Sequence, residues 1–153
     1  MAATQSNGNG RVYSPDILTS GQIDMADRII EASRAAGLNP AFMIALAVTE
    51  SSLNPKAIGD DGLSVGLFQL NKRFITASME ELLDADFNIS AAMEKMALLI
   101  RSFPGNTFGD YAEAWTLGGA GRFRRMRRNP RKLTDMEEAI RDLTLTLSLR
   151  EIP

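Results

Sequence analysis

One carboxylate at the end of an apolar run is the first candidate for chemistry in this chain. Glu50 comes two residues after Phe42–Val48, a segment in which every residue is apolar. Burial disfavours the ionised form of a carboxylic acid, and a carboxyl group that keeps its proton near neutral pH is what a general acid requires. An arginine partner, or a helix end that reaches solvent, would explain the same residue without catalysis. Its position alone leaves both interpretations open.

The composition excludes several other kinds of active site. The 153 residues include no histidine and no cysteine. This excludes Ser/His and Cys/His nucleophile pairs, zinc sites built on His or Cys, and disulfides. We expect no cofactor and no metal site. Acid–base chemistry near neutral pH therefore falls to carboxylates, with Lys or Tyr as weaker candidates.

The apolar pattern predicts a mainly α-helical domain. Helical spacing runs from Ser20 to Gly37, and a second helix follows Asn39-Pro40. The second helix is apolar nearly all round, which is typical of a buried helix, and it should end near Asn54-Pro55 because the residue before proline disfavours helix. Further helices are expected over residues 78–84, 90–103, 108–117 and 134–149, the second of these after a capped start at Asp86–Ser90.

Turn signals interrupt the helical pattern after Glu50. Gly59-Asp60-Asp61-Gly62 is a turn sequence, and Leu63–Leu70 fits a short strand or an extended loop. A small irregular or β-like insertion is therefore expected there. Residues 1–20 are polar and lack the basic start and apolar centre of a secretory signal, so we expect a flexible leader followed by a single domain over residues 21–153.

Four short motifs follow one another along the chain. They are Glu50-Ser51 with Asn54-Pro55-x-Ala57, then Gly66-Leu67-Phe68-Gln69, then Asp86-Phe87-Asn88-Ile89, and finally Ala114–Phe123. They are similar to Glu-Ser with Asn-Pro-x-Ala, Gly-Leu-Met-Gln, Asp-Pro-x-x-Asn-Ile and Ala-Tyr-Asn-Ala-Gly-x-Gly-Arg-Val. In this order they resemble the lysozyme-like superfamily, particularly the soluble lytic transglycosylase family. The resemblance implies a lysozyme-like domain with a reduced β part.

The resemblance also implies a reaction. Members cleave the β-1,4 bond between N-acetylmuramic acid and N-acetylglucosamine in peptidoglycan. Glu50 would protonate the leaving oxygen and then, ionised, accept the proton of the sugar's 6-hydroxyl, which gives a 1,6-anhydro product. Animal-type lysozymes have an aspartate where this chain has Ser64, so the usual second carboxylate of a hydrolase is missing. For hydrolysis, Asp60 or Asp61 would have to hold a water; otherwise they form a solvated turn.

Other residues are candidates for substrate binding, beginning with Ser64 at the vacant second-acid position. Gln69, nineteen residues after Glu50, is carried over as a hydrogen-bond partner of the N-acetyl group or of Glu50. Its alternative role is to satisfy the backbone of the loop. Phe68 next to it is a core residue or a ligand contact.

The last motif departs from the family pattern. Trp115 and Thr116 stand where the family has tyrosine and asparagine, and an indole has one N–H donor and no hydroxyl. Tyr111, one helical turn earlier, would then direct a hydroxyl to the glutamate, or Trp115 would stack on a sugar; its alternative is a core aromatic. Gly59 stands where the family tends to have serine.

A basic run follows the last predicted site residues. Residues 122–132 carry seven basic and no acidic side chains, although the whole chain has a net charge of −2. Such runs are usually solvated helix ends or loops, but this one is also a candidate docking patch for an anionic polymer or protein. It lacks the aromatic interleaving expected of specific nucleic-acid binding. The candidate patch consists of Arg122, Arg124, Arg125, Arg127 and Arg128.

Two functions from different classes remain open. The first is a peptidoglycan-cleaving enzyme that acts on glycan strands, as a transglycosylase or as a lysozyme-type hydrolase. The second is a weakened lysozyme-like module that binds protein partners in a larger assembly, such as a virion. Glu50 and Gln69 favour the enzyme, and Gly59 and Trp115 favour the module. No apolar run reaches the roughly 20 residues of a membrane span. The resemblance and the polar start imply a bacteriophage endolysin or a virion-carried protein.

Overall fold

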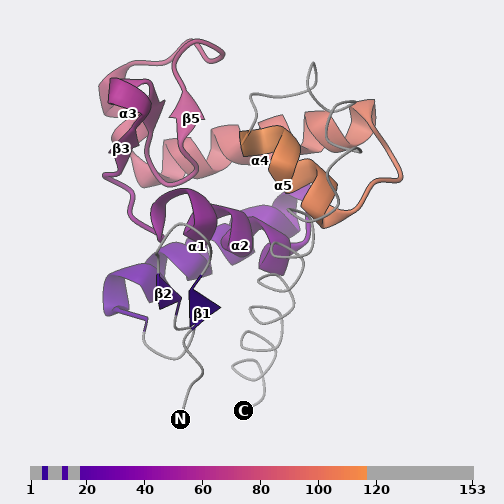
Figure 1. Cartoon of the computed structure of the whole chain (residues 1–153), viewed down its shortest axis with the longest axis horizontal. Helices are drawn as coiled ribbons and strands as arrows, with labels where there is room; N and C mark the ends of the chain where they lie inside the picture. The colour runs from indigo at the N-terminus through magenta and orange to yellow at the C-terminus, as the bar shows by residue number, and fades with distance from the viewer. Residues whose placement is uncertain (1–4, 7–11, 14–17, 117–153) are drawn as a thin grey trace.

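The computed structural model describes residues 5–6, 12–13 and 18–116 (Figure 1). The described part is mainly α-helical with a small antiparallel sheet, which confirms the fold class predicted from the sequence. The helices are α1 (Ser20–Ala36), α2 (Pro40–Ser51), α3 (Met79–Leu83), α4 (Ala85–Ser102) and α5 (Phe108–Thr116), with a single 3₁₀ turn at Asp60–Gly62. The sheet consists of β3 (Ile58–Gly59), β4 (Ser64–Val65) and β5 (Leu70–Asn71), and a separate ribbon pairs β1 (Gln5–Ser6) with β2 (Val12–Tyr13).

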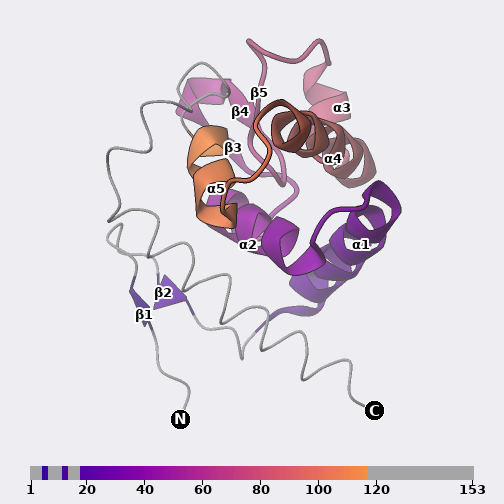
Figure 2. The ribbon, with the colours of Figure 1, turned by 90° about the vertical axis from the view of Figure 1, so that its right-hand side faces the viewer.

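Helix α2 is the buried centre of the domain. Its N-cap is Asn39, whose side chain accepts the Phe42 N–H at 3.0 Å, and Pro40 is the first residue of the helix. Every residue from Ala41 to Ala47 is buried. Figure 2 shows α1 on one side of α2 and α5 on the other. The rings of Phe42 and Phe108 stack at 4.8 Å between centroids, which joins α2 to α5.

The start of helix α1 is bonded to the C-terminal end of α2. It begins with a capping box between Thr19 and Gln22 and ends at Gly37, which has a left-handed φ of 70°. The Gln22 side chain also donates to the Ser52 carbonyl at 3.0 Å. The start of α1 and the end of α2 are therefore joined directly.

The start of α4 differs from the prediction. The helix begins at Ala85, and the cap is Asp84, whose side chain accepts the Phe87 N–H at 2.8 Å. Asp84 stands four residues before Asn88, so Asp84 and not Asp86 matches the spacing of Asp-Pro-x-x-Asn-Ile. Asp86 is exposed and lies 3.3 Å from a guanidinium nitrogen of Arg28.

The insertion after α2 is a three-stranded antiparallel sheet in the order β3-β4-β5. Val65 is paired with Ile58 on one side and with Leu70 on the other. A tight turn over Gly66–Gln69 joins β4 to β5, with the Gln69 N–H donating to the Gly66 carbonyl at 3.1 Å. The segment predicted as one strand or loop is thus two short strands and a turn.

Asn88 joins this sheet to the helices. The side chain is fully buried, and its oxygen accepts the Phe68 N–H at 2.9 Å. Its nitrogen donates to the carbonyls of Val65 at 3.0 Å and of Leu82 at 2.9 Å. A Cβ at Gly66 would lie 2.3 Å from that nitrogen, so glycine is needed for this close approach. One amide therefore satisfies three backbone groups from two segments.

Three further predictions concern the leader over residues 1–20, the helix over residues 134–149 and the absence of a membrane span. Within residues 1–20, which were expected to form a flexible leader, the structure describes the β1–β2 ribbon. The boundary at residue 20 stays a prediction. The helix predicted over residues 134–149 lies outside the described residues. No helix in the described part is long and apolar enough to span a membrane.

We expect Asn88→Leu to lower the free energy of unfolding by about 3 kcal/mol, because it preserves volume but leaves three buried backbone groups without their partner. Urea unfolding followed by circular dichroism measures this. Asn54→Ala is the control, since Asn54 is exposed and its side chain makes one local hydrogen bond, to the Lys56 N–H. A loss at Asn88 no larger than that at Asn54 would contradict the bridging role.

Candidate active site

Glu50 lies in the last turn of α2 and is half-buried. The chain leaves the helix abruptly, with Ser52 and Leu53 both in left-handed conformation (φ 55° and 60°). The Ser51 hydroxyl is buried 2.7 Å from the Leu67 carbonyl oxygen, so the end of α2 is bonded to the β4–β5 turn. The position of Glu50 relative to this turn is therefore set by its neighbour.

The charge of Glu50 affects the pKa of a lysine on α4, Lys95. Burial lowers the pKa of Lys95, and the negative charge of Glu50 acts in the opposite direction and raises it, with burial as the larger effect. The Lys95 ammonium nitrogen also lies 4.1 Å from the centre of the Trp115 ring. A cation over an indole face gains roughly 0.5–2 kcal/mol, which offsets part of the desolvation.

Trp115 is a core aromatic. It is 4% exposed, and its indole N–H donates to the Phe68 carbonyl at 3.1 Å. Its ring meets the ring of Phe68 edge-on, with centroids 6.2 Å apart. A sugar-stacking platform needs an open ring face, so the structure does not favour that interpretation. Phe68 is fully buried, so of the two roles predicted for it the structure supports the core residue.

Gln69 serves the loop backbone. Its side-chain nitrogen lies 3.1 Å from the Ala57 carbonyl oxygen and 3.0 Å from that of Gly66. Its side-chain oxygen would lie 2.6 Å from a Cβ at Gly59. The glycine that departs from the family pattern is therefore required by the position of Gln69. The predicted contact of Gln69 with an N-acetyl group stays a prediction.

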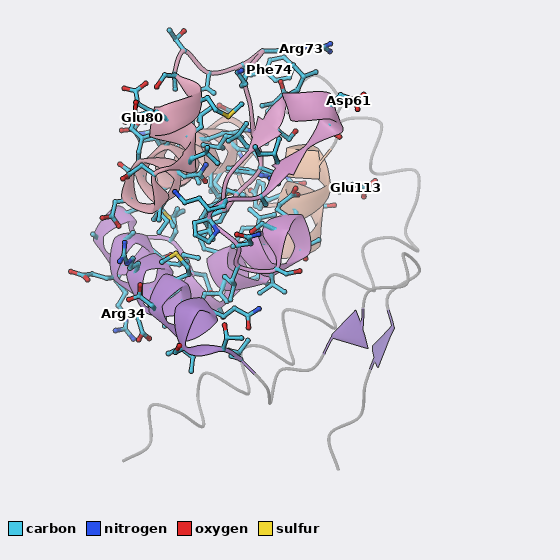
Figure 3. All side chains as sticks on the ribbon, turned by 90° about the vertical axis from the view of Figure 1, so that its left-hand side faces the viewer. Arg34, Asp61, Arg73, Phe74, Glu80 and Glu113 are labelled. Atoms are coloured by element: carbon cyan, nitrogen blue, oxygen red, sulfur yellow. The ribbon has the colours of Figure 1, made fainter. Side chains whose placement is uncertain are left out.

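Ser64, which stands where a hydrolase would have its second catalytic carboxylate, is bonded to the carboxylate of Asp60. Ser64 is buried, and its hydroxyl donates to a carboxylate oxygen of Asp60. Asp60 and Asp61 are both exposed and both have positive φ. Figure 3 shows Asp61 at the outer end of the insertion, pointing away from the helices. Asp60, not Asp61, is thus the aspartate that this part of the structure holds in place.

Tyr111 does not take the place of the family's tyrosine. Its side chain is 3% exposed, and its hydroxyl donates to the Phe103 carbonyl at 2.5 Å, between the end of α4 and the start of α5. A hydroxyl has one proton to donate, so this bond leaves none for Glu50. The expectation that Tyr111 directs its hydroxyl to Glu50 is wrong.

Some predicted residues lie beyond what the structure describes. The side chain of Thr116 and the candidate patch of Arg122, Arg124, Arg125, Arg127 and Arg128 are outside the described residues. Within the described ranges, no cluster of acidic side chains is arranged to hold a metal ion. A depression of about 930 Å³ lies between α1 and α4, and its lining includes Ala32, Ala97 and Leu98 but none of the site residues.

The site therefore centres on Glu50, a half-buried glutamate at the end of the central apolar helix α2. Its neighbour Ser51 bonds this end of the helix to the small sheet. The family model of the transglycosylase SLT domain matches residues 27–138, which is well over half of the chain. The chain belongs to this family. The SLT family assignment indicates peptidoglycan cleavage of the lytic transglycosylase type, with peptidoglycan as the substrate class. A comparison with individual curated proteins found no match.

Sequence reasoning missed two residues of this SLT domain. Asn88 belongs to the third motif, but the motif does not indicate its role as a bridge between sheet and helices. Lys95 was not singled out, although Asn88, Ala92, Lys95 and Leu99 follow helical spacing and three of the four are buried. A lysine on the buried stripe of a helix is the signal that was available.

We expect Gly59→Ala to destabilise the domain by roughly 1–3 kcal/mol, because the added methyl group displaces the Gln69 amide from its two carbonyl acceptors. Thermal or urea unfolding measures the change. In a Gln69→Ala background the same substitution should cost little, since the clashing atom is gone. Equal costs in both backgrounds would show that the contact between positions 59 and 69 is unimportant.

Proposed function

We propose that this SLT domain is a lytic transglycosylase in which Glu50 is the single catalytic carboxylate. The observation that carries the proposal is that Glu50 is half-buried while Ser64 occupies the position at which animal-type lysozymes have their second carboxylate. A retaining or inverting hydrolase commonly needs two carboxylates on opposite sides of the scissile bond. Ser64 cannot act as one, because a hydroxyl does not ionise near neutral pH.

The proposed reaction uses Glu50 twice. The protonated carboxyl group gives its proton to the glycosidic oxygen as the bond from that oxygen to C1 breaks. The substrate's own N-acetyl group stabilises the positive charge that develops at C1. The ionised Glu50 then accepts the proton of the 6-hydroxyl while that oxygen bonds to C1. The product has a 1,6-anhydro end, and no water is consumed.

Hydrolysis is the second candidate, and one contact favours it. The Ser64 hydroxyl holds the Asp60 carboxylate, so an acidic group is tied to the position where a second carboxylate is expected. In this alternative Asp60 would hold the attacking water, and the products would have reducing ends. A bacteriophage or virion setting, a protein-binding role and the arginine patch stay predictions from the sequence.

We expect Glu50→Gln to reduce release of fragments from purified peptidoglycan by roughly 100-fold or more, since the amide cannot supply the proton. Mass spectrometry of the fragments identifies their ends, and anhydro ends from the unmodified chain support transglycosylation. Glu31→Gln makes the same acid-to-amide change at an exposed position of α1 and is the matched control, which should leave release unchanged. If neither the unmodified chain nor Glu50→Gln released fragments between about pH 4 and 8, the proposed enzymatic activity would be contradicted and the binding module would be favoured.

Asp60→Asn separates the two reactions. If Glu50 works alone, the variant keeps its rate within about threefold and continues to form anhydro ends, because the amide still accepts a hydrogen bond from Ser64. Asp61→Asn is the matched control on the same turn. Reducing ends from the unmodified chain, lost in Asp60→Asn and kept in Asp61→Asn, would establish the hydrolase instead.

A further inference from the structure

The loop after β5 begins with an exposed tip, formed by Lys72, Arg73 and Phe74. All three side chains are exposed, and Phe74, at 68%, is the most exposed of the large apolar side chains that the structure describes. Figure 3 shows Arg73 and Phe74 at the outer end of the insertion, directed away from the helices. A single exposed apolar side chain is common on protein surfaces, so exposure alone does not indicate a binding site.

The main chain of the tip is held in place by hydrogen bonds. The Asn71 side-chain oxygen accepts the Arg73 N–H at 2.9 Å, and the Asn71 carbonyl accepts the Phe74 N–H at 3.0 Å. The Lys72 N–H donates to the Leu63 carbonyl at 2.8 Å. These bonds are made by backbone atoms and by Asn71, so the tip side chains project from a fixed backbone. Such preorganisation lowers the entropic cost of binding a ligand.

The tip carries a local positive charge on an acidic part of the chain. Residues 18–116 include thirteen acidic and seven basic side chains, and Lys72 and Arg73 are the one pair of neighbouring basic residues in this range. Neither forms an ion pair with another described residue. In Figure 3, Asp61 and Glu80 lie to either side of the tip, so the positive charge of the insertion is local. A polymer that carries carboxylates would be attracted here and repelled by most of the remaining surface.

The tip adjoins the candidate active site through β5. Asn71, the residue before the tip, is paired across the sheet with Ser64, which stands at the position of the second acid. Strand β5 lies at one edge of the β3-β4-β5 sheet, and no further strand of the described part pairs with it. A long substrate that crosses the sheet beside Ser64 would therefore pass the tip.

We propose that this tip docks the peptidoglycan strand away from the bond that is cleaved: Phe74 packs on the C–H face of a sugar ring, and Lys72 and Arg73 pair with carboxylates of the stem peptides. This docking role rests on the proposed function, because it takes peptidoglycan as the substrate of Glu50. The phenyl ring and the apolar face of the sugar both leave water on contact, and each exposed ion pair adds a small further gain. The tip thereby favours wall that carries free carboxylates over neutral glycan.

The first test measures binding without turnover, in the full chain with Glu50→Gln as the parent. Purified peptidoglycan, freed of attached phosphate polymers, is sedimented with each protein, and the bound fraction gives the dissociation constant. We expect the double variant Lys72→Ala/Arg73→Ala to bind roughly threefold to tenfold more weakly, as for the loss of two exposed ion pairs, and Phe74→Ala about fivefold more weakly. Phe74→Tyr keeps the ring face and should bind as the parent does.

Matched controls make the same changes elsewhere on the surface. Arg34→Ala/Arg101→Ala removes two exposed positive charges from α1 and α4, and Leu98→Ala removes an apolar side chain that is 58% exposed. Both should bind as the parent does. The basic run over residues 122–132 is the same in every variant, so it cannot produce a difference among them. Losses in the controls equal to those at the tip would show a general effect of surface charge and would overturn the proposal.

The second test changes the ligand. In peptidoglycan whose carboxylates have been converted to neutral methyl amides, the double variant Lys72→Ala/Arg73→Ala should bind like the parent, while Phe74→Ala should still bind more weakly. On unmodified peptidoglycan, raising the salt from about 0.05 M to about 0.5 M should remove the effect of the double variant, because exposed charges are screened. A charge effect that persists on the amidated material would contradict pairing with stem-peptide carboxylates.

The outcomes distinguish docking from the proposed reaction. If the unmodified chain releases no fragments but the tip variants of the Glu50→Gln parent bind more weakly, the reaction fails and the docking role stands. If fragments are released and the tip variants bind as tightly as the parent, the reaction stands and the docking role falls. A parent that does not bind peptidoglycan at all would also overturn the docking role. Far-UV circular dichroism establishes that each variant is folded.

Discussion

The buried amide of Asn88 is the interaction on which the rest of the site depends. Strands of two residues cannot form a stable sheet alone, so the β3–β5 insertion needs an outside anchor. Asn88 provides it through backbone groups of Val65, Phe68 and Leu82, and the close approach requires glycine at position 66. The anchor lies in the first turns of α4, and the helix cap at Asp84 fixes where those turns begin.

The β4–β5 turn connects three helices through its main chain. The Leu67 carbonyl accepts from Ser51 on α2, the Phe68 N–H is bonded to α4, and the Phe68 carbonyl accepts from Trp115 on α5. These bonds are made to backbone atoms, while the side chains of Leu67 and Phe68 fill the core. The catalytic candidate and the residues around it are therefore placed by rigid elements and not by a loose loop.

Local patterns in the sequence were sufficient for most of the helices but not for the site. Apolar periodicity and Pro40 placed α1 and α2 closely, because burial and capping are local in origin. The sequence pattern predicts the start of α4 five residues late, since Asp84 and Asp86 are equally good caps until Arg28 and Asn88 are positioned. Motif resemblance identified Glu50. It could not show that Tyr111 bonds to Phe103 or that Lys95 meets Trp115, because those contacts depend on how separate helices pack.

The contact between Gly59 and Gln69 has a consequence for how this chain can change over generations. A side chain at position 59 would need the space that the Gln69 amide fills, so the residue tolerated at either position depends on the residue at the other. A chain with serine at position 59 and the long amide still at position 69 would be less stable because of the clash. Shortening residue 69 first would remove the clash but also the two hydrogen bonds to the Ala57 and Gly66 carbonyls. Either single change therefore makes the chain less stable, so we expect the residues at positions 59 and 69 to change together.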